Sequence, residues 1–217
     1  MDGQLLSSLW AATLETFYMV SVSAVLAALL GLPLGLLLVI TSPGGFLPNP
    51  GFQRFLGSVV NIGRSLPFII LLVAIIPLTR LIVGTTIGST AALVPLTLSA
   101  IPFFARVSET SLLEVDRGLI EAAEAMGCTY WQIIFKVLIP EALPSLILGL
   151  TIMVISLIGY SAMAGVVGGG GLGDLAIRYG YQRFDTKVML ITVLLLIGLV
   201  QVVQFVGDRL AHQVRKR

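Results

Sequence analysis

Long stretches of the sequence carry no charged side chain, and one of them runs from Thr16 to Gln53. A helix that crosses the hydrocarbon core of a bilayer needs about 20 mainly apolar residues, and its backbone polar groups bond to one another within the helix. Only 11% of the 217 residues are charged. A soluble domain carries about a quarter charged residues, because a water-compatible surface has to cover its core. The chain is therefore predicted to be an integral membrane protein.

The apolar segments predict an all-α membrane fold with five spanning helices. The predicted spans are residues 17–40, 56–79, 85–105, 142–166 and 188–207. Residues 1–217 then form a single transmembrane domain, and residues 106–141 form its longest polar loop. This loop is too short for a nucleotide-binding domain, and the sequence contains no G-x-x-x-x-G-K-[ST] motif. Energy for transport would have to come from a partner protein or from an ion gradient.

The distribution of Lys and Arg predicts the orientation, because these residues gather in short cytoplasmic loops. With the N-terminus outside, the cytoplasmic segments hold twice as many Lys and Arg residues as the external ones. The cytoplasmic set is Arg54, Arg106, Arg117, Lys136, Arg209, Arg215, Lys216 and Arg217, and the external set is Arg80, Arg178, Arg183 and Lys187. We therefore expect an external N-terminus and a cytoplasmic C-terminus.

The loop at residues 106–141 contains two segments with helical character. Ile120–Met126 is rich in good helix formers, Gly127 is expected to end that helix, and Thr129 is expected to cap the next one. Four apolar residues of the second segment recur at spacings of three and four, which predicts one shared face. They are Trp131, Ile134, Phe135 and Leu138. Such a face needs cover, either from the membrane surface or from a partner protein.

The same loop carries a recognisable motif. Glu121-Ala122-Ala123, then Gly127, then Val137-Leu-Ile139-Pro140 resembles the EAA loop of bacterial ABC import permeases. In that family the loop forms a coupling helix that sits in a cleft of the cytoplasmic ATPase. The family pattern has Ile and Leu where this chain has Val137 and Ile139. The resemblance assigns ATPase coupling to Glu121, Ala122, Ala123, Gly127, Trp131 and Pro140.

The resemblance covers essentially the whole chain. The segments 61–68 (NIGRSLPF), 100–106 (AIPFFAR) and 159–165 (GYSAMAG) are similar to the methionine-uptake branch of the family. This implies a type I importer permease in the bacterial inner membrane, working as a homodimer with a cytoplasmic ABC ATPase dimer and an extracytoplasmic substrate-binding protein. ATP and Mg would be bound by the ATPase, so this chain would need no cofactor, metal or catalytic residue and no nucleic-acid partner.

The substrate rests on the resemblance alone. It implies methionine, in its D or L form, and close analogues. The serious alternative is a permease of the same machinery that carries another amino acid or small solute. A secondary transporter is less favoured, because the spans hold no Asp or Glu at depth. An intramembrane aspartyl protease is also less favoured: Gly171-Leu-Gly-Asp174 fits a G-x-G-D signature, but a second intramembrane aspartate is missing.

Arg64 is the main irregularity within the spans. Only Ser65–Thr79 separates it from Arg80, and this segment as a helix would cover about 22 Å of a core that is about 30 Å thick. One arginine therefore snorkels to the surface or faces a wet or protein-lined interior. Prolines within the second and third spans, at Pro67, Pro77, Pro95 and Pro102, are expected to kink these helices.

A pathway or gate is expected from polar and soft side chains in the spans. The candidates are Asn61, Arg64, Ser65, Phe103, Tyr160, Ser161 and Met163. Within this group Gly159–Gly165 is favoured as the gate by the family resemblance and by its flanking glycines.

Overall fold

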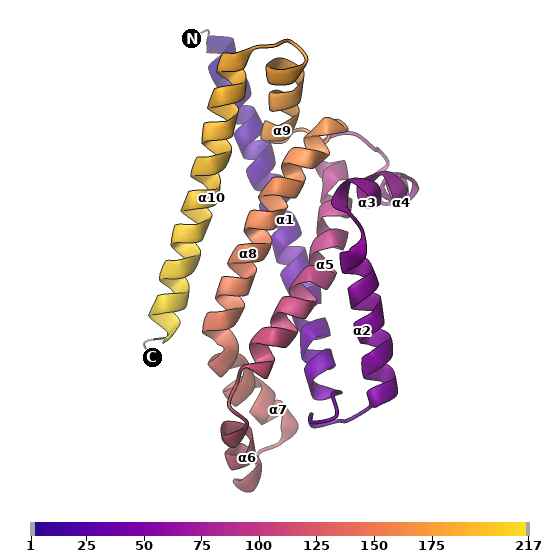
Figure 1. The fold of residues 1–217 in the computed structure, drawn as a ribbon, viewed down its shortest axis with the longest axis vertical. Coiled ribbons are helices and arrows are strands. Elements are labelled where there is room, and N and C mark those ends of the chain that lie inside the picture. The colour runs from indigo at the N-terminus through magenta and orange to yellow at the C-terminus, as the bar shows by residue number, and fades with distance from the viewer. Residues whose placement is uncertain (1–2, 216–217) are drawn as a thin grey trace.

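The structure is a computed structural model that describes residues 3–215, and every regular element in this range is a helix. The helices form an elongated bundle (Figure 1). Their bounds are α1 Gly3–Ile40, α2 Pro50–Ser65, α3 Phe68–Ala74, α4 Ile76–Val83, α5 Ser89–Leu113, α6 Arg117–Ala125, α7 Tyr130–Ile133, the π-helix η1 Ile134–Leu138, α8 Ile139–Val166, α9 Gly171–Leu175, the π-helix η2 Ala176–Tyr181 and α10 Thr186–Arg215. The predicted all-α fold is confirmed.

Four helical segments of the described range are long and apolar enough to cross a membrane. They are α1, α5, the continuous helix Tyr130–Val166 that joins α7, η1 and α8, and α10. The bent pair α2 and α3 makes a fifth candidate if it is counted as one span. The fold therefore has four to five apolar spans, in agreement with the sequence.

The core of the bundle lies where α1 and α5 pack along each other, with α8 beside them. Small residues allow this close approach: a Cβ added to Gly35 on α1 would lie 2.6 Å from the carbonyl oxygen of Ala105 on α5. Such small residues are typical of membrane helix interfaces, where backbones come close together. Met19, Leu96 and Leu157, one from each of these three helices, are fully or almost fully buried at this junction.

The predicted second span, residues 56–79, is not one straight helix. α2 ends at Ser65, and α3 leaves it at an angle of 98°. Pro67 explains the break, because it lacks a backbone N–H and forces the preceding Leu66 into an extended conformation (ψ 123°). By contrast, Pro77 occupies the first turn of α4, and Pro95 and Pro102 lie inside an uninterrupted α5.

Other helices extend beyond the predicted spans. α1 begins at Gly3, well before residue 17, and α10 covers Thr186–Arg215. α5 continues to Leu113, so the loop expected from residue 106 begins at Glu114. Within this extension of α5, Arg106 and Glu109 form an ion pair three residues apart, an arrangement that adds a small stabilisation to a helix.

The two ends of the bundle differ. α6 and α7 project from one end, and α9 packs beside the start of α1 at the opposite end (Figure 1). We call these the α6–α7 end and the α9 end. α10 runs from the α9 end toward the α6–α7 end, so the two termini point in opposite directions. Lys216 and Arg217, used in the charge argument above, lie outside the described residues.

Candidate functional site

The α6–α7 projection is built by two local capping motifs. Asp116 caps α6 by accepting a hydrogen bond from the backbone N–H of Gly118 (2.7 Å). α6 ends in a Schellman motif: Gly127 has a φ of +78°, and the N–H of Cys128 donates to the carbonyl of Ala123. Thr129 and Gln132 then form a capping box at the start of α7. The predicted helix-ending role of Gly127 and the predicted capping role of Thr129 are confirmed.

The side chains predicted to couple to an ATPase mostly lie on the outside of this projection. Ala123 is buried and anchors α6, whereas the other members are exposed: Glu121, Ala122, Gly127, Trp131 and Pro140. Trp131 is 69% exposed and Met126 77% exposed. Large exposed apolar side chains clustered at the tip of a projection are typical of a protein–protein contact.

The predicted common face of the second segment is wrong. Ile134 and Leu138 are buried against the bundle, whereas Trp131 and Phe135 are exposed and stack on each other with ring centroids 5.8 Å apart. The change of direction coincides with the π-helix at Ile134–Leu138. Pro140 has no N–H to offer the helix, and the N–H of Ile139 instead bonds to the carbonyl of Ile134, five residues back.

The loop between α1 and α2 supports the projection, a contact that the sequence analysis missed. Phe46 in this loop packs against Tyr130 with ring centroids 5.7 Å apart. The guanidinium of Arg117 lies over Gly44, where an added Cβ would be 3.0 Å from it. A cavity of about 340 Å³ remains between the loop and α6. The turn residues Pro43, Gly44 and Gly45 marked the loop but gave no indication of its partner.

Asn61, one of the predicted pathway residues, connects α2 to α5. Its carboxamide oxygen accepts a hydrogen bond from Arg106 (2.6 Å), and Arg106 also donates to Glu109 (2.5 Å). Glu109 is buried, at 7% exposure. Arg64 and Ser65, also predicted, are exposed on the same helix as Asn61. Sequence reasoning missed Arg106 and Glu109, although their spacing of three residues was an available signal.

The other predicted pathway residues point in different directions. Tyr160 stacks on Phe68 of α3, with centroids 4.8 Å apart and rings nearly parallel. Ser161 is 2% exposed and its hydroxyl donates to the carbonyl of Ile158, whereas Met163 is 47% exposed. Phe103 packs against the main core. Within one chain, the seven candidates therefore do not gather into one cavity.

The glycine-rich segment after α8 is a tight turn held by α1. The backbone N–H of Gly171 donates to Glu15 (2.7 Å), and that of Leu172 donates to Thr16 (2.9 Å). Gly168, Gly170 and Gly171 all have positive φ, which glycine adopts without strain. These glycines are therefore accounted for by the backbone conformation that the turn requires.

Asp174, the aspartate of the G-x-G-D match, forms an ion pair with Arg178. The hydrogen bond to Asp174 raises the pKa of Arg178, and burial opposes the rise. The partner of the Asp174 carboxylate is therefore an arginine. An aspartyl protease requires a second carboxylate facing the first.

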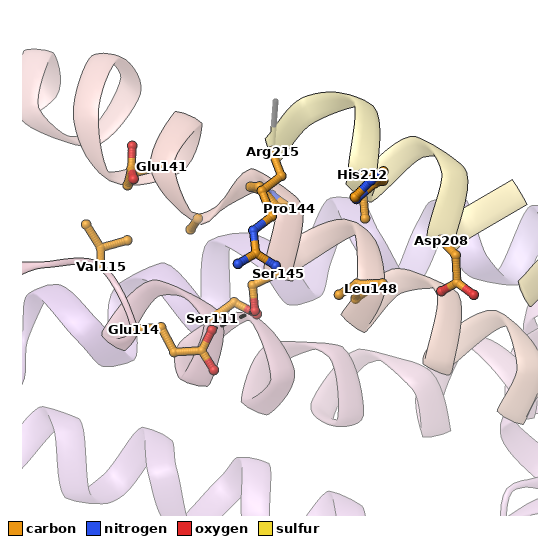
Figure 2. A pocket seen from close by; sticks show the side chains of 12 residues that line it. Ser111, Glu114, Val115, Glu141, Pro144, Ser145, Leu148, Asp208, His212 and Arg215 are labelled. Atoms are coloured by element: carbon orange, nitrogen blue, oxygen red, sulfur yellow. Dashed lines mark hydrogen bonds between the residues drawn. The ribbon is translucent and has the colours of Figure 1, made fainter. Parts of the chain in front are cut away.

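A cleft of about 490 Å³ lies between α5, α8 and α10 toward the α6–α7 end. Figure 2 shows Arg215 reaching from α10 toward Ser145, and the hydroxyl of Ser145 donates to Glu114 (2.9 Å). Glu141, Asp208 and His212 also line the cleft. Among the described residues no group of His, Cys, Asp and Glu could hold a metal ion. The cleft contains none of the predicted site residues.

Comparison with known proteins identifies the family. Residues 31–216 match the family described as "Binding-protein-dependent transport system inner membrane component". The chain belongs to this permease family. The permease is 57% identical over 206 residues to the "Probable D-methionine transport system permease protein MetI" of Vibrio cholerae, which covers 95% of this chain and 92% of that protein. It is 44% identical over 212 residues to the "Methionine import system permease protein MetP" of Bacillus subtilis, covering 98% and 96%.

The permease also has a close structural neighbour. A chain of the structure described as "Inward facing conformations of the MetNI methionine ABC transporter" is 50% identical, covers 99% of both chains and superimposes with a TM-score of 0.97. A chain from an amino acid ABC transporter crystallised with histidines superimposes with a TM-score of 0.79 at 18% identity, which shows the shared fold alone. The predicted ABC permease is confirmed as a multi-pass inner-membrane protein.

Proposed function

We propose that this chain is the membrane-spanning subunit of an ATP-driven importer for methionine. The relatives named for methionine transport align over nearly the whole chain, and the methionine transporter structure aligns over 99% of it at 50% identity. The observation that carries the proposal is the α6–α7 projection, which presents Glu121, Met126 and Trp131 on its surface.

The projection transmits the motion of a partner ATPase to the spans. The exposed apolar tip docks into the ATPase, which binds ATP and Mg. The helix from Tyr130 to Val166 is continuous, so a movement of α7 caused by the ATPase is carried along this helix into the bundle. This assignment gives Glu121, Ala122, Gly127, Trp131 and Pro140 a common role at the docking surface, with Ala123 as the anchor of α6.

Two copies of the chain enclose the pathway. Asn61, Arg64 and Ser65 are exposed on α2 of one chain, so a second copy is needed to close that surface into a passage. Met163 is exposed on α8 and reaches the passage from there, while Tyr160 and Phe103 support it from the core. Ser161 is buried and shapes α8. The α9 end faces outward and receives methionine from a binding protein, and the α6–α7 end is cytoplasmic.

The alternative is a permease for another amino acid. The distant relative crystallised with histidines shares the fold at 18% identity, so the fold itself does not select the substrate. The experiment therefore measures substrate directly. The chain is co-expressed with the ABC ATPase of its own genome, and the purified complex is reconstituted into proteoliposomes. The substrate-binding protein is added on the side from which the substrate is taken up.

Uptake of radiolabelled L-methionine, D-methionine and L-histidine is then measured with ATP and with a non-hydrolysable analogue. We expect ATP-dependent uptake of methionine and none of histidine. ATP-dependent uptake of histidine instead would show the alternative permease. Co-purification of the ATPase with the wild-type chain and with Trp131→Ala tests the coupling role of the projection, and we expect the variant to retain less ATPase. A wild-type chain that binds no ATPase would refute this role.

A further inference from the structure

The cleft between α5, α8 and α10 has no part in the proposed transport cycle. Two of its helices each turn one side toward it. On α8 this side carries Glu141, Ser145 and Leu148, which lie four and three residues apart, and on α10 it carries Asp208 and Arg215, which lie seven residues apart. The lining of the cleft therefore combines charged, hydroxyl and apolar side chains.

The cleft lies where the spans change from apolar to charged. Glu141 directly precedes the charge-free residues 142–173, and Asp208 directly follows the charge-free residues 188–207. Next to Asp208, α10 is in tight contact with α8, because a Cβ added to Gly207 would overlap the side chain of Thr151. The hydrocarbon core of the bilayer covers the charge-free residues, so the charged side chains of the cleft lie at the level of the lipid headgroups.

The cleft is on a side of the bundle that faces lipid. Only 11% of the most apolar stretch of α10 is buried, and large side chains such as Leu194, Ile197 and Phe205 are exposed on this helix. Figure 1 shows α10 and α2 on opposite sides of the bundle. This step rests on the proposed function, in which the second copy lies against α2 and leaves the side of α10 to the membrane.

The charges in the cleft do not neutralise one another. Three carboxylates, of Glu114, Glu141 and Asp208, stand against one guanidinium, of Arg215. None of the four forms an ion pair with another described residue. The carboxylate of Glu114 accepts a hydrogen bond from Ser145 (2.9 Å), and a carboxylate can accept several more. The cleft can therefore bind a cation at its carboxylates and an anion at Arg215.

Ser111 independently indicates that the cleft binds a ligand. It lines the cleft from α5 and is only 3% exposed, yet its hydroxyl forms no hydrogen bond with any other residue in the range 3–215. A buried hydroxyl without a partner is unfavourable, and an acceptor bound in the cleft would satisfy it. Figure 2 shows Arg215 extending into the same cleft toward Ser145.

A phosphoethanolamine group matches this arrangement. Its ammonium offers three N–H donors to carboxylates, and its phosphate accepts hydrogen bonds from a guanidinium and from hydroxyls. A metal ion does not fit, because the residues that the structure describes include no group of His, Cys, Asp and Glu that could hold one. An anionic headgroup without an ammonium would be repelled by the carboxylates, and a choline headgroup has no N–H to donate to them.

We propose that the cleft binds the headgroup of a phosphatidylethanolamine molecule. Its ammonium lies at Glu114, and its phosphate lies at Arg215 and the hydroxyl of Ser111. The acyl chains then run along Leu148 and Ile152, which are exposed one turn apart on α8. In the part of the chain that the structure describes, α5 and α10 have almost no direct contact, so the bound lipid connects these two helices.

Native mass spectrometry of the chain in complex with its ATPase tests the site. The complex is stripped of lipid in detergent and titrated with phosphatidylethanolamine, phosphatidylglycerol or phosphatidylcholine, all with the same acyl chains. Glu114→Gln and Arg215→Gln each remove one proposed contact. Arg209→Gln is the matched control for the arginine, because Arg209 is on the same turn region of α10 but lies over Phe205 and outside the cleft. Asp174→Asn is the control for the carboxylate, at the opposite end of the bundle.

We expect one phosphatidylethanolamine per chain, bound at least about tenfold more tightly than either other lipid, because charge-assisted hydrogen bonds are the stronger ones. Each cleft variant should weaken this binding by about tenfold, and Glu114→Gln should also abolish the preference over phosphatidylglycerol. The two control variants should bind as the wild type does. Equal affinity for the three lipids, or equal losses in cleft and control variants, would overturn the inference.

The phosphoethanolamine group also occurs in soluble phosphoesters, so the source of the ligand needs its own measurement. Glycerophosphoethanolamine, which has the same headgroup and no acyl chains, is added to the lipid-bound complex. We expect the lipid to stay bound, and displacement at concentrations equal to those of the lipid would overturn the assignment to a membrane lipid. Because the titration uses neither ATP nor methionine, lipid binding by a complex that takes up no methionine would refute the proposed substrate alone.

Discussion

Phe46, in the loop between α1 and α2, lies against Tyr130 at the first residue of α7, with ring centroids 5.7 Å apart. Phe46 also packs on the buried cluster of Leu112, Leu138 and Leu146, which joins α5 to the helix Tyr130–Val166. The loop therefore connects the first two helices to the projection that is proposed to receive the ATPase. We therefore expect a displacement of α7 to be transmitted to α1 and α2 through this aromatic contact as well as along the helix Tyr130–Val166.

Replacing Phe46 with alanine should weaken coupling without preventing assembly. The aromatic contact contributes about 0.5–1.5 kcal/mol beyond burial, and its loss lets α7 move without displacing the loop. We expect fewer methionine molecules transported per ATP hydrolysed, measured as the ratio of uptake to phosphate release in proteoliposomes. Leu47→Ala, at a neighbouring side chain that is 55% exposed, is the matched control. Equal ratios for both variants would argue against the role of Phe46.

Gly127 should accept asparagine far better than valine. A Cβ at this position meets no atom within 4 Å, so the only obstacle is its φ of +78°. The left-handed conformation costs an ordinary residue about 1–2 kcal/mol, less for Asn and more for a β-branched side chain. Gly127→Asn should keep most methionine uptake, and Gly127→Val should lose most of it while still inserting in the membrane. Normal uptake by the valine variant would show that the turn is not needed for coupling.

A double-mutant cycle should detect the contact between α8 and α5 at Gly149. A Cβ there would lie 2.2 Å from Cγ1 of Val107 but 3.7 Å from its Cβ. Gly149→Ala should lower the free energy of unfolding by about 1–3 kcal/mol through overpacking. Val107→Ala in the same chain removes the clashing methyl, so the double variant should be more stable than the sum of the single effects predicts. The stabilities of the wild type, the two single variants and the double variant are measured by thermal unfolding in detergent. Strictly additive effects of the two substitutions would contradict the contact.

Asp174→Asn should have a small effect that does not depend on pH between about 6 and 9. The Arg178 side chain is 59% exposed, and such pairs contribute at most about 1 kcal/mol. The hydrogen bond to Asp174 raises the pKa of Arg178, so the stabilisation is complete below the unfolded-state pKa and is lost only as pH rises through the folded-state value, well above this window. A Tm difference between wild type and variant that changes across this range would point to another titrating group.

The predictions that rested on capping residues were confirmed, whereas of the four prolines expected to kink helices only Pro67 separates two helices at a sharp bend. Gly127 and Thr129 end and begin helices because their motifs use only neighbouring residues. Pro67 breaks its helix for the same reason, but the 98° angle between α2 and α3 and the burial of Phe68 in the core were not predicted. The predicted face that joined Ile134 to Trp131 failed, because periodicity shows which residues are aligned and not which of them a neighbouring helix covers.

The sequence alone determined that this chain is a helical membrane protein whose longest polar loop contains two capped helical segments, since scarcity of charge, apolar length and capping residues act within one segment. The permease assignment came from the resemblance of that loop to a known family. Only the tertiary structure decided which side chains meet. Asn61 and Arg106 lie 45 residues apart, and Glu15 and Gly171 lie 156 residues apart. Contacts of this kind depend on how two separate helices are placed and rotated against each other, and no single segment of sequence contains that information.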